Sequence, residues 1–250
     1  MISQRAQEVK GRGFILRLTP AQEADVIVNI LTATGDKVSA FARAGLKSRK
    51  RFGGALEPLL HVDYRMTCKS GRDLFYLEET QIIHDFRNIK KQIERLASAS
   101  YLAELVEHSA QEGLEHVEIY DLFGAALRAL DAGLSFAGVL RQFEVKLLAI
   151  LGWLPSLNRC GRCEVGGRTM SLDPHQGLVL CQDCGGQMQI LISQDLQETL
   201  SYLLRTSILK SQVNSQILSS LEKVTSTLLS AHWGNRRLKS ADFLKSVSIS

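Results

Sequence analysis

The sequence predicts a mixed α+β protein with two parts, a small antiparallel β-barrel and a helical domain that follows it. Over the first 84 residues apolar and polar positions alternate as they do in strands, whereas after residue 85 apolar residues recur every three or four positions, as in helices. A polar, glycine-rich insert with four cysteines interrupts the helical part at about 156–189. We therefore expect domains at 1–84 and 85–250, the second carrying the insert.

Five N-terminal segments are rich in β-branched and aromatic residues at alternating positions, which is typical of strands. Turn-forming residues, Thr34 to Lys37 and Lys69 to Arg72, separate two pairs of them. Five strands without intervening helices suit a barrel of the oligonucleotide-binding (OB) type, although an SH3-like barrel has a similar composition. The segments are GFILRLT, DVIVNILTA, KVSAFARA, LLHVDYRMTC and LFYLEETQII.

Large apolar residues at helical spacing mark the second part, both before and after the insert. We expect these residues to form the buried faces of packed helices. The serine-rich stretch SQVNSQILSSLEKVTSTLLS has a lower helix propensity than the rest. The positions are Ile119, Leu122, Phe123, Ala126, Leu127 and Leu130, then Phe136, Val139, Leu140, Phe143, Leu147 and Leu148, and later Leu196, Leu200, Leu203, Leu204, Ile217, Leu218, Leu221 and Val224.

The composition excludes several classes of protein. With 250 residues, 45% of them hydrophobic, the chain can bury a core without disulfides. The 30 Lys+Arg barely exceed the 26 Asp+Glu, so binding of a polyanion requires local clusters of charge. No apolar run is long enough to cross a bilayer, and MISQRAQEVKGRGF does not resemble a signal peptide. We expect a cytoplasmic protein with reduced cysteines.

Four of the five cysteines have the spacing of a structural zinc site. Cys160 and Cys163, seventeen intervening residues, and Cys181 and Cys184 form two CxxC pairs, which predict one tetrathiolate ion. The stretch TMSLDPHQGLVL predicts a β-hairpin that returns the second pair to the first. Four protein ligands leave no open position on the metal, so we expect one structural zinc ion that stabilises the insert. Cys68, in phase with the strand residues Val62, Tyr64 and Met66, is expected to face the core.

We considered an enzymatic alternative, a zinc-dependent nucleobase deaminase. His116 and Glu118 followed by Cys160 and Cys163 resemble its His-x-Glu and Pro-Cys-x-x-Cys motifs. However, Arg159 stands where that motif has proline, and two cysteines would have no role. Phosphate-binding glycine loops, HExxH and recognisable nucleophile motifs are missing from the sequence. The sequence therefore favours a protein without catalytic residues.

The stretch RAGLKSRKRFGGALEP, residues 43–58, concentrates positive charge between the third and fourth predicted strands. We expect it to form a flexible loop that binds nucleic-acid phosphates, with nearby aromatic residues stacking on bases. A solvated basic loop with no partner is the simpler interpretation of such a charge run. The cations are Arg43, Lys47, Arg49, Lys50 and Arg51, and the candidate stacking residues are Phe41, Phe52 and Tyr64.

Three motifs together resemble the RecO family of bacterial recombination-mediator proteins: ARAGLKSRKRFGGALEPLL, LRQFEVKLLAILGWLPSLNRCGRC and RRLKSADFLKSV. The resemblance covers nearly the whole chain. It implies an OB-fold followed by a helical domain with a zinc module, and no catalytic activity. It also implies binding and annealing of single- and double-stranded DNA and, with RecR, loading of RecA onto DNA coated by single-strand-binding protein (SSB). The resemblance assigns DNA phosphates to the five cations and the metal to the four cysteines.

The resemblance further implies contact with the acidic C-terminal tail of SSB. Such a tail needs a cation beside an apolar pocket, and Arg141 in VLRQFEVKLL is the candidate; an ion pair with Glu144 is the alternative. Arg128 and the basic segment with Arg236, Arg237 and Lys239 are the other places we consider. Phosphate contacts do not distinguish DNA from RNA, so an RNA-binding factor of the translation machinery is the alternative function.

Overall fold

The computed structural model describes residues 7–68, 74–110, 112–166, 169–173, 176–185, 190–210, 212–234 and 237–248. The turn expected at Lys69 to Arg72 lies outside these ranges. Backbone contacts divide the chain into two compact units, Met1–Leu127 with Phe243–Ser250, and Arg128–Asp242. Among the described helices, none has the length and apolar character needed to cross a bilayer.

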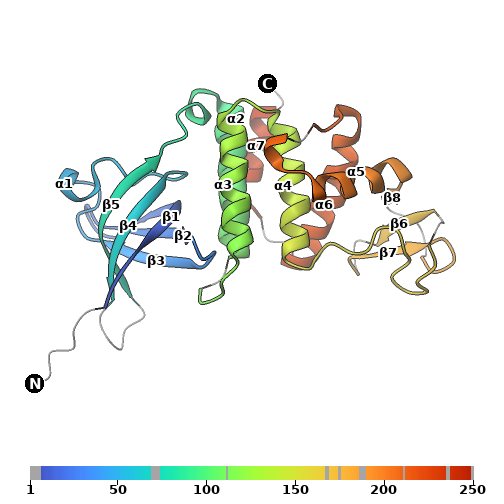
Figure 1. Ribbon diagram of the computed structural model, residues 1–250, viewed down its shortest axis with the longest axis horizontal. Helices are drawn as coiled ribbons and strands as arrows, with labels where there is room; N and C mark the ends of the chain where they lie inside the picture. Colours follow the sequence, from blue (N-terminus) through green and yellow to red (C-terminus); the bar gives the residue numbers. More distant parts are fainter. Residues whose placement is uncertain are drawn as a thin grey trace, which may run out of the picture. The chain divides into compact units, whose positions relative to one another are not determined.

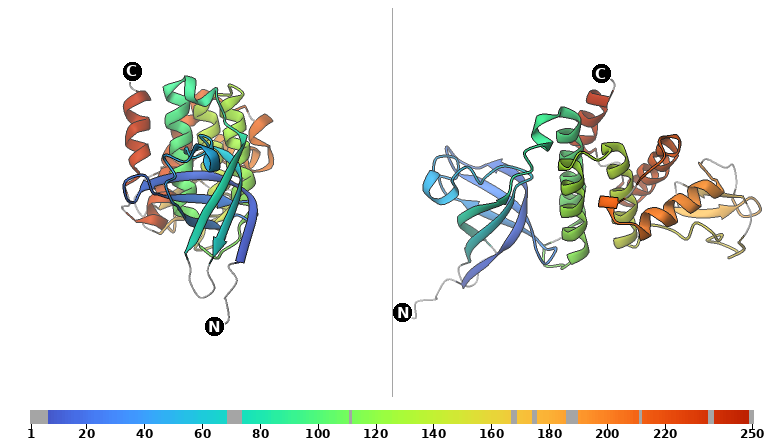
Figure 2. Two further views of the ribbon diagram at one scale, coloured as in Figure 1. Left: turned by 90° about the vertical axis from the view of Figure 1, so that its left-hand side faces the viewer. Right: turned by 45° about the horizontal axis from the view of Figure 1, so that its top comes forward.

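Five strands close into a barrel in the order β1-β2-β3-β5-β4 (Figure 1). β3 and β5 pair in parallel, and the other neighbours pair antiparallel. This is an OB-fold, as predicted, and all five expected strands are present. In Figure 2 the blue strands cross the teal strands where the sheet curls onto itself. The strands are β1 (Gln7–Pro20), β2 (Val26–Thr32), β3 (Lys37–Ala42), β4 (His61–Cys68) and β5 (Phe75–His84).

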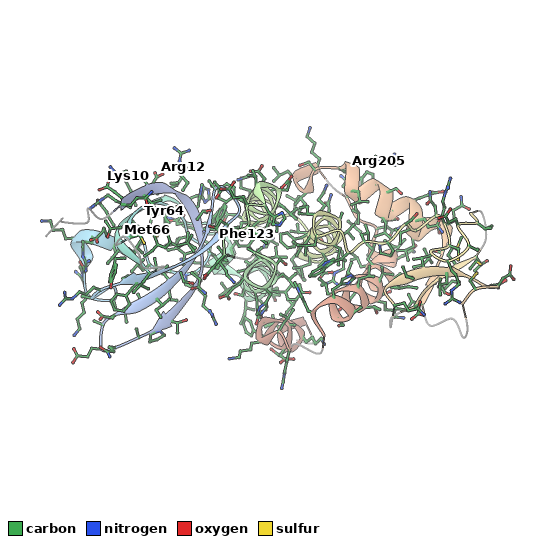
Figure 3. All side chains as sticks on the ribbon, turned by 90° about the horizontal axis from the view of Figure 1, so that it is seen from below. Lys10, Arg12, Tyr64, Met66, Phe123 and Arg205 are labelled. Atoms are coloured by element: carbon green, nitrogen blue, oxygen red, sulfur yellow. The ribbon has the colours of Figure 1, made fainter. Side chains whose placement is uncertain are left out.

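The barrel core comes from alternate strand residues. On β4, Val62, Tyr64 and Met66 are buried, and Figure 3 shows Tyr64 and Met66 inside the barrel. Cys68 continues this alternation and is half-buried at the end of the strand. The Tyr64 ring leaves no room for a side chain at Gly11 of β1, where a Cβ would lie 2.6 Å from the tyrosine hydroxyl. The first strand therefore needs glycine at that position.

Aromatic contacts join the barrel to α3 within the first unit. Phe14 of β1 packs edge-on against Phe123, with ring centroids 5.2 Å apart, and stacks on His61 at 4.5 Å. His61 Nε2 is also 2.8 Å from the hydroxyl of Tyr120. The helices after the barrel are η1 (Ile89–Lys91), α2 (Ile93–Ser109) and α3 (Val117–Asp131). The apolar face predicted for α3 is buried.

The second unit is built around α4 (Phe136–Ile150), which is buried on nearly all sides and packs against α5 and α6. Side chains of α4 bind the carbonyl groups at the C-terminus of α5. Gln142 Nε2 donates to the oxygens of Leu203 (2.9 Å) and Thr206 (2.8 Å), and Lys146 Nζ donates to that of Leu204 (2.7 Å). The other helices of this unit are α5 (Gln194–Arg205), η2 (Ile208–Lys210), η3 (Ser215–Ile217) and α6 (Leu218–Trp233). The last helix, α7 (Lys239–Ser248), begins in this unit and continues into the first, which includes Phe243–Ser250.

The insert forms the predicted β-hairpin and one further strand. β6 (Met170–Asp173) pairs with β7 (Leu178–Cys181), with Met170 opposite Cys181, and β8 (Ile190–Ile192) pairs with the other edge of β6. The buried side chains of this small sheet are few, among them Met170, Leu172, Val179 and Ile192. Such a small core supports the expectation that the insert needs a metal ion to fold.

Candidate metal centre and nucleic-acid interface

The four cysteines of the insert lie together, with all four sulfur atoms within 4.8 Å of one another. Cys160 and Cys181 are buried, Cys184 is half-buried and Cys163 is exposed. Sequence spacing therefore predicted this group correctly. Among the residues that the structure describes, it is the single group of three or more potential metal ligands.

The distance between two of the sulfurs matches that of a tetrahedral zinc site. Four sulfurs about 2.3 Å from a zinc ion are about 3.8 Å apart along each edge of the tetrahedron. The sulfurs of Cys163 and Cys181, one from each pair, are 3.7 Å apart. The structure thus brings two ligands from distant parts of the chain to the separation that a shared ion requires.

A backbone hydrogen bond and a side-chain hydrogen bond attach the first cysteine turn to β7 and to the second turn. Gly161 N donates to the carbonyl oxygen of Val179 on β7 over 2.7 Å, and Arg162 Nη1 donates to that of Cys184, also over 2.7 Å. Arg162 therefore bridges the first CxxC turn to the second. The hairpin positions Cys181 because this residue ends β7, opposite Met170.

The thiols differ in their readiness to ionise. Backbone N–H groups of Cys163 and Cys181 point at the Cys160 sulfur and lower its pKa to about 6. The pKa of Cys184 is raised to about 12, first by the hydrogen bond between its sulfur and that of Cys163 and then by burial. Four thiols this close cannot all ionise against one another, whereas a divalent cation among them stabilises all four thiolates.

His116 does not join the cysteines in the metal-binding group among the described residues. Its backbone packs instead against Gly35 in the first unit, where an added Cβ would lie 2.0 Å from the His116 oxygen. The group of potential metal ligands therefore consists of four cysteines and lacks the histidine of the deaminase motif. His175, a further potential ligand in the hairpin, lies outside the described residues.

The basic segment, residues 43–58, is more ordered than the flexible loop that we predicted. Its centre is a one-turn helix, α1 (Arg49–Phe52), on the side of the barrel away from α2 (Figures 1 and 2). Ala44 N donates to the carboxylate of Asp25 over 2.6 Å, and Leu46 N donates to the oxygen of Ala24 over 3.1 Å. Local bonds and the buried Phe52 thus attach the segment to the barrel, which the charge run alone did not reveal.

The two glycines that follow α1 explain how the segment turns back to the barrel. Gly53 (φ 52°) and Gly54 (φ 85°) both have left-handed backbone conformations that side chains disfavour. The Gly53 N–H closes the helix by donating to the Arg49 oxygen over 2.8 Å. Ala55 and Leu56 then enter the barrel core.

The five cations of this segment are not equivalent. Arg43, Lys47, Arg49 and Lys50 are exposed, and no ion pair of these four side chains is found within the described residues. Arg51 is half-buried and serves the segment itself. Its Nε donates to Ser48 Oγ (3.1 Å), its Nη2 donates to the Arg43 oxygen, and its guanidinium lies 4.8 Å from the Phe52 ring centroid.

Two of the three proposed stacking residues are unavailable. Phe52 and Tyr64 are buried in the barrel core, so neither ring can stack on a base. For Tyr64 the alternation of β4 already indicated this, because Tyr64 is in phase with Val62 and Met66, whereas Phe52 lies in α1 and has no strand alternation to show its burial. Phe41 is half-exposed, and it packs edge-on against Tyr76 of β5. Sequence reasoning did not single out Tyr76.

An acidic residue of α2 binds cations of the barrel, which the sequence analysis also missed. Glu107 Oε1 forms an ion pair with Arg17 Nε (2.9 Å) and accepts a hydrogen bond from Asn29 Nδ2 (2.6 Å). The Glu107 main-chain oxygen accepts a hydrogen bond from Lys37 Nζ (3.0 Å). Two cations on the barrel surface are thus engaged by α2.

Arg141 forms the ion pair with Glu144 that was the alternative to a partner contact. The guanidinium lies 3.0 Å from the carboxylate, and both side chains are buried in α4, with Arg141 10% and Glu144 1% exposed. Thr225 of α6 donates to the other oxygen of Glu144. Arg128 is exposed, Arg237 pairs with Asp242 over 2.7 Å, and Arg236 lies outside the described residues.

Two family models match this chain. One, described as Recombination protein O N terminal, matches residues 6–86, and the other, Recombination protein O C terminal, matches residues 90–242. The chain belongs to the RecO family. The resemblance inferred from three sequence motifs is therefore confirmed, and with it membership in a family of DNA repair proteins.

Several RecO proteins resemble the chain along much or all of its length. The DNA repair protein RecO of Anaeromyxobacter sp. strain K is 39% identical over 178 residues, which cover 70% of each chain. That of Symbiobacterium thermophilum is 32% identical over 247 residues, 94% of this chain and 96% of its own. That of Alkaliphilus metalliredigens is 26% identical over 246 residues, 96% and 99% respectively.

Each of the two family models covers a different candidate site. The N-terminal match contains the barrel and the basic segment, and the C-terminal match contains the four cysteines and Arg141. Each candidate site therefore lies within a region typical of the RecO family.

Proposed function

We propose that this protein is a non-catalytic DNA-binding recombination mediator. It binds single- and double-stranded DNA through the OB domain at 1–84 and anneals complementary strands. With RecR it helps load RecA onto DNA coated by SSB during recombinational repair. Its site of action is the nucleoid in the cytoplasm, and its function involves neither a membrane nor a small-molecule substrate.

The observation that carries this proposal is the exposed set of cations on the basic segment, attached by α1 to a RecO-type barrel. Phosphates are neutralised by Arg43, Lys47, Arg49 and Lys50, whose side chains project into solvent. Contacts of this kind are independent of base sequence, which annealing of any two complementary strands requires. Arg51, the fifth cation of the predicted set, contributes by holding the segment in shape.

Charge reversal tests the proposed DNA site. We expect the triple variant Lys47→Glu, Arg49→Glu and Lys50→Glu to bind DNA more weakly and to show a log–log salt slope smaller by about 0.7–0.9 for each lost phosphate contact. The matched control reverses three exposed lysines elsewhere, Lys210, Lys223 and Lys245, with the same change in net charge. Equal losses in both variants would show that total charge, and not the basic segment, binds DNA.

Competition with RNA separates the proposal from its alternative. A recombination mediator should anneal complementary DNA strands and keep DNA bound in the presence of a matched RNA strand. Preference for RNA, without annealing of DNA, would favour the translation-factor interpretation.

We assign one structural zinc ion to Cys160, Cys163, Cys181 and Cys184. Bound there, zinc supplies a fourfold cross-link and neutralises thiolate charge, while the protein fills all four coordination positions. The role is one of folding, consistent with the small core of β6 to β8. No residue of this site acts on a substrate in our proposal.

For the SSB tail we keep Arg141 as the candidate contact, although its charge is already paired with Glu144. The tail would have to compete with that carboxylate or share the guanidinium. Titration of a labelled acidic tail peptide into Arg141→Lys and Arg128→Ala variants distinguishes the two places. Unchanged affinity in Arg141→Lys, with a loss in Arg128→Ala, would move the contact to the exposed residue.

A further inference from the structure

A row of side chains crosses the outer face of the barrel from strand to strand. Thr19 lies opposite Ile27, Ile27 opposite Phe41, Phe41 opposite Tyr76, and Tyr76 opposite Thr67. These residues point outward because their strand neighbours Val26, Val28, Ala40, Ala42 and Leu77 are buried in the core. Three consecutive members of the row are therefore apolar or aromatic on a surface that faces solvent.

The middle of this row is accessible. Ile27 is 37% exposed, and the rings of Phe41 and Tyr76 are half-buried. The two rings meet edge to face, with centroids 6.1 Å apart and planes at 79°. Because perpendicular rings do not stack on each other, ring surface is left that a flat aromatic ligand can cover.

The neighbouring row on the same face is covered by other residues. Two residues further along the strands, Arg17, Asn29 and Ser39 lie side by side. Glu107 binds the first two, and Glu112 accepts a hydrogen bond from Ser39 Oγ over 3.2 Å. Residues of α2 and of the turn that follows it thus cover this part of the face, and the exposed row begins where their cover ends.

The basic segment borders the other side of the row. Arg43 follows Phe41 by two residues, and the segment is bonded to Ala24 and Asp25, two to three residues before Ile27. The row is therefore followed by a cation, Arg43, at the end of β3, and at the start of β2 the backbone of the basic segment is attached to the barrel. A ligand that spans the row and the segment needs flat apolar groups linked to negative charges at short intervals.

We propose that Phe41 and Tyr76, flanked by Ile27, form a base-stacking platform that makes the basic segment prefer single-stranded DNA. This inference rests on the proposed function and adds to it the group that distinguishes the two forms of DNA. Cations alone attract both forms, because both carry phosphates. The faces of the bases are free in a single strand and covered by neighbouring bases in a duplex, so an aromatic platform binds only the former.

The test replaces the rings and keeps their apolar character. The double variant Phe41→Leu and Tyr76→Leu is expected to bind a mixed-sequence single strand about tenfold more weakly. Its affinity for a duplex of the same length should stay within about twofold, and its salt slope should match wild type, because the phosphate contacts are intact. Tyr202→Leu, which removes a 38% exposed aromatic ring on α5, is the matched control and should change neither affinity.

Two results would overturn the platform. The first is that the double variant binds the single strand with wild-type affinity. The second is that its affinities for the single strand and for the duplex fall in equal proportion. Wild-type protein that binds neither form of DNA would instead refute the proposed function itself.

A measurement on the wild-type protein covers the case in which the double variant does not fold. A single strand that carries photoreactive iodouracil bases should crosslink to peptides of β3 or β5 that contain Phe41 or Tyr76, and the corresponding duplex should not. Crosslinks confined to other peptides would contradict the inference.

Discussion

Glu107 on α2 forms an ion pair with Arg17 on β1 at 2.9 Å, and the same carboxylate oxygen accepts a hydrogen bond from Asn29 on β2. Arg17 is 59% exposed, so its share of this contact is screened by water, whereas Asn29 is buried and depends on the acceptor. One carboxylate thus connects a helix to two strands of the barrel. It also occupies a cation that would otherwise be available to a phosphate.

Removal of this carboxylate should destabilise the first unit. Glu107→Ala leaves the Asn29 amide buried with one acceptor fewer, and we expect the free energy of unfolding to fall by about 1–3 kcal/mol. Urea denaturation measures this change. Glu112→Ala is the control, because Glu112 makes an exposed 3.2 Å bond to Ser39 and should cost less than about 0.5 kcal/mol. Equal effects of the two substitutions would contradict the role given to Glu107.

Arg51 and its neighbour Lys50 should affect DNA binding in different ways. Lys50→Ala removes an exposed cation, so the salt slope should fall by about 0.7–0.9 with no change in melting temperature. Arg51→Ala removes the bonds to Ser48 and Arg43, so the melting temperature should fall while the salt slope changes less. DNA binding at several salt concentrations, with thermal melting, checks both. Identical slopes and melting curves for the two variants would show that Arg51 is simply another phosphate contact.

Loss of the metal should unfold the insert. We expect Cys181→Ser to lose bound zinc and to melt at a lower temperature, since three remaining ligands hold the ion poorly and the sheet of β6 to β8 has a small core. Cys68→Ser is the matched control, because Cys68 lies on β4 and outside the cysteine group. Metal analysis should find one zinc ion per chain in wild type and in the control. A Cys181→Ser protein with full zinc content would refute the four-ligand site.

The barrel should lose stability at alkaline pH. Burial, and to a lesser degree the charge of Asp36, raise the pKa of Tyr64 above its usual value near 10. A raised pKa in the folded state means that this contribution to stability is complete below about pH 10 and is lost as the pH rises through the folded pKa. Tyrosinate absorbance should therefore show a late-ionising step, and Tyr64→Phe should reduce that step by one tyrosine. A titration curve that Tyr64→Phe leaves unaltered would contradict the assignment.

Local patterns were sufficient for much of this protein. Strand alternation predicted five strands, three-to-four spacing predicted the buried face of α3, and the two CxxC pairs predicted the cysteine group. These features depend on neighbours in the chain, or on a ligand spacing that chemistry restricts narrowly. The first strand is longer than its apolar segment, because Gln7 to Gly13 pair with β4 although their own sequence has little strand character.

Partners across the fold decided the rest. Arg51 and Lys50 are adjacent cations in the sequence, yet one bonds within the basic segment and the other faces solvent. Arg141 looked like an edge residue in the sequence, yet it is buried and paired with Glu144, whose other carboxylate oxygen accepts a hydrogen bond from Thr225.

Phe41 and Tyr76 meet only because β3 and β5 pair in parallel when the barrel closes, a contact between strands thirty-odd residues apart. The sequence by itself determined which segments become strands, helices and metal ligands, because these follow from nearest-neighbour geometry and side-chain chemistry. Only the tertiary structure decided which cations and rings remain exposed, because exposure depends on the residues that long-range pairing places on top of them.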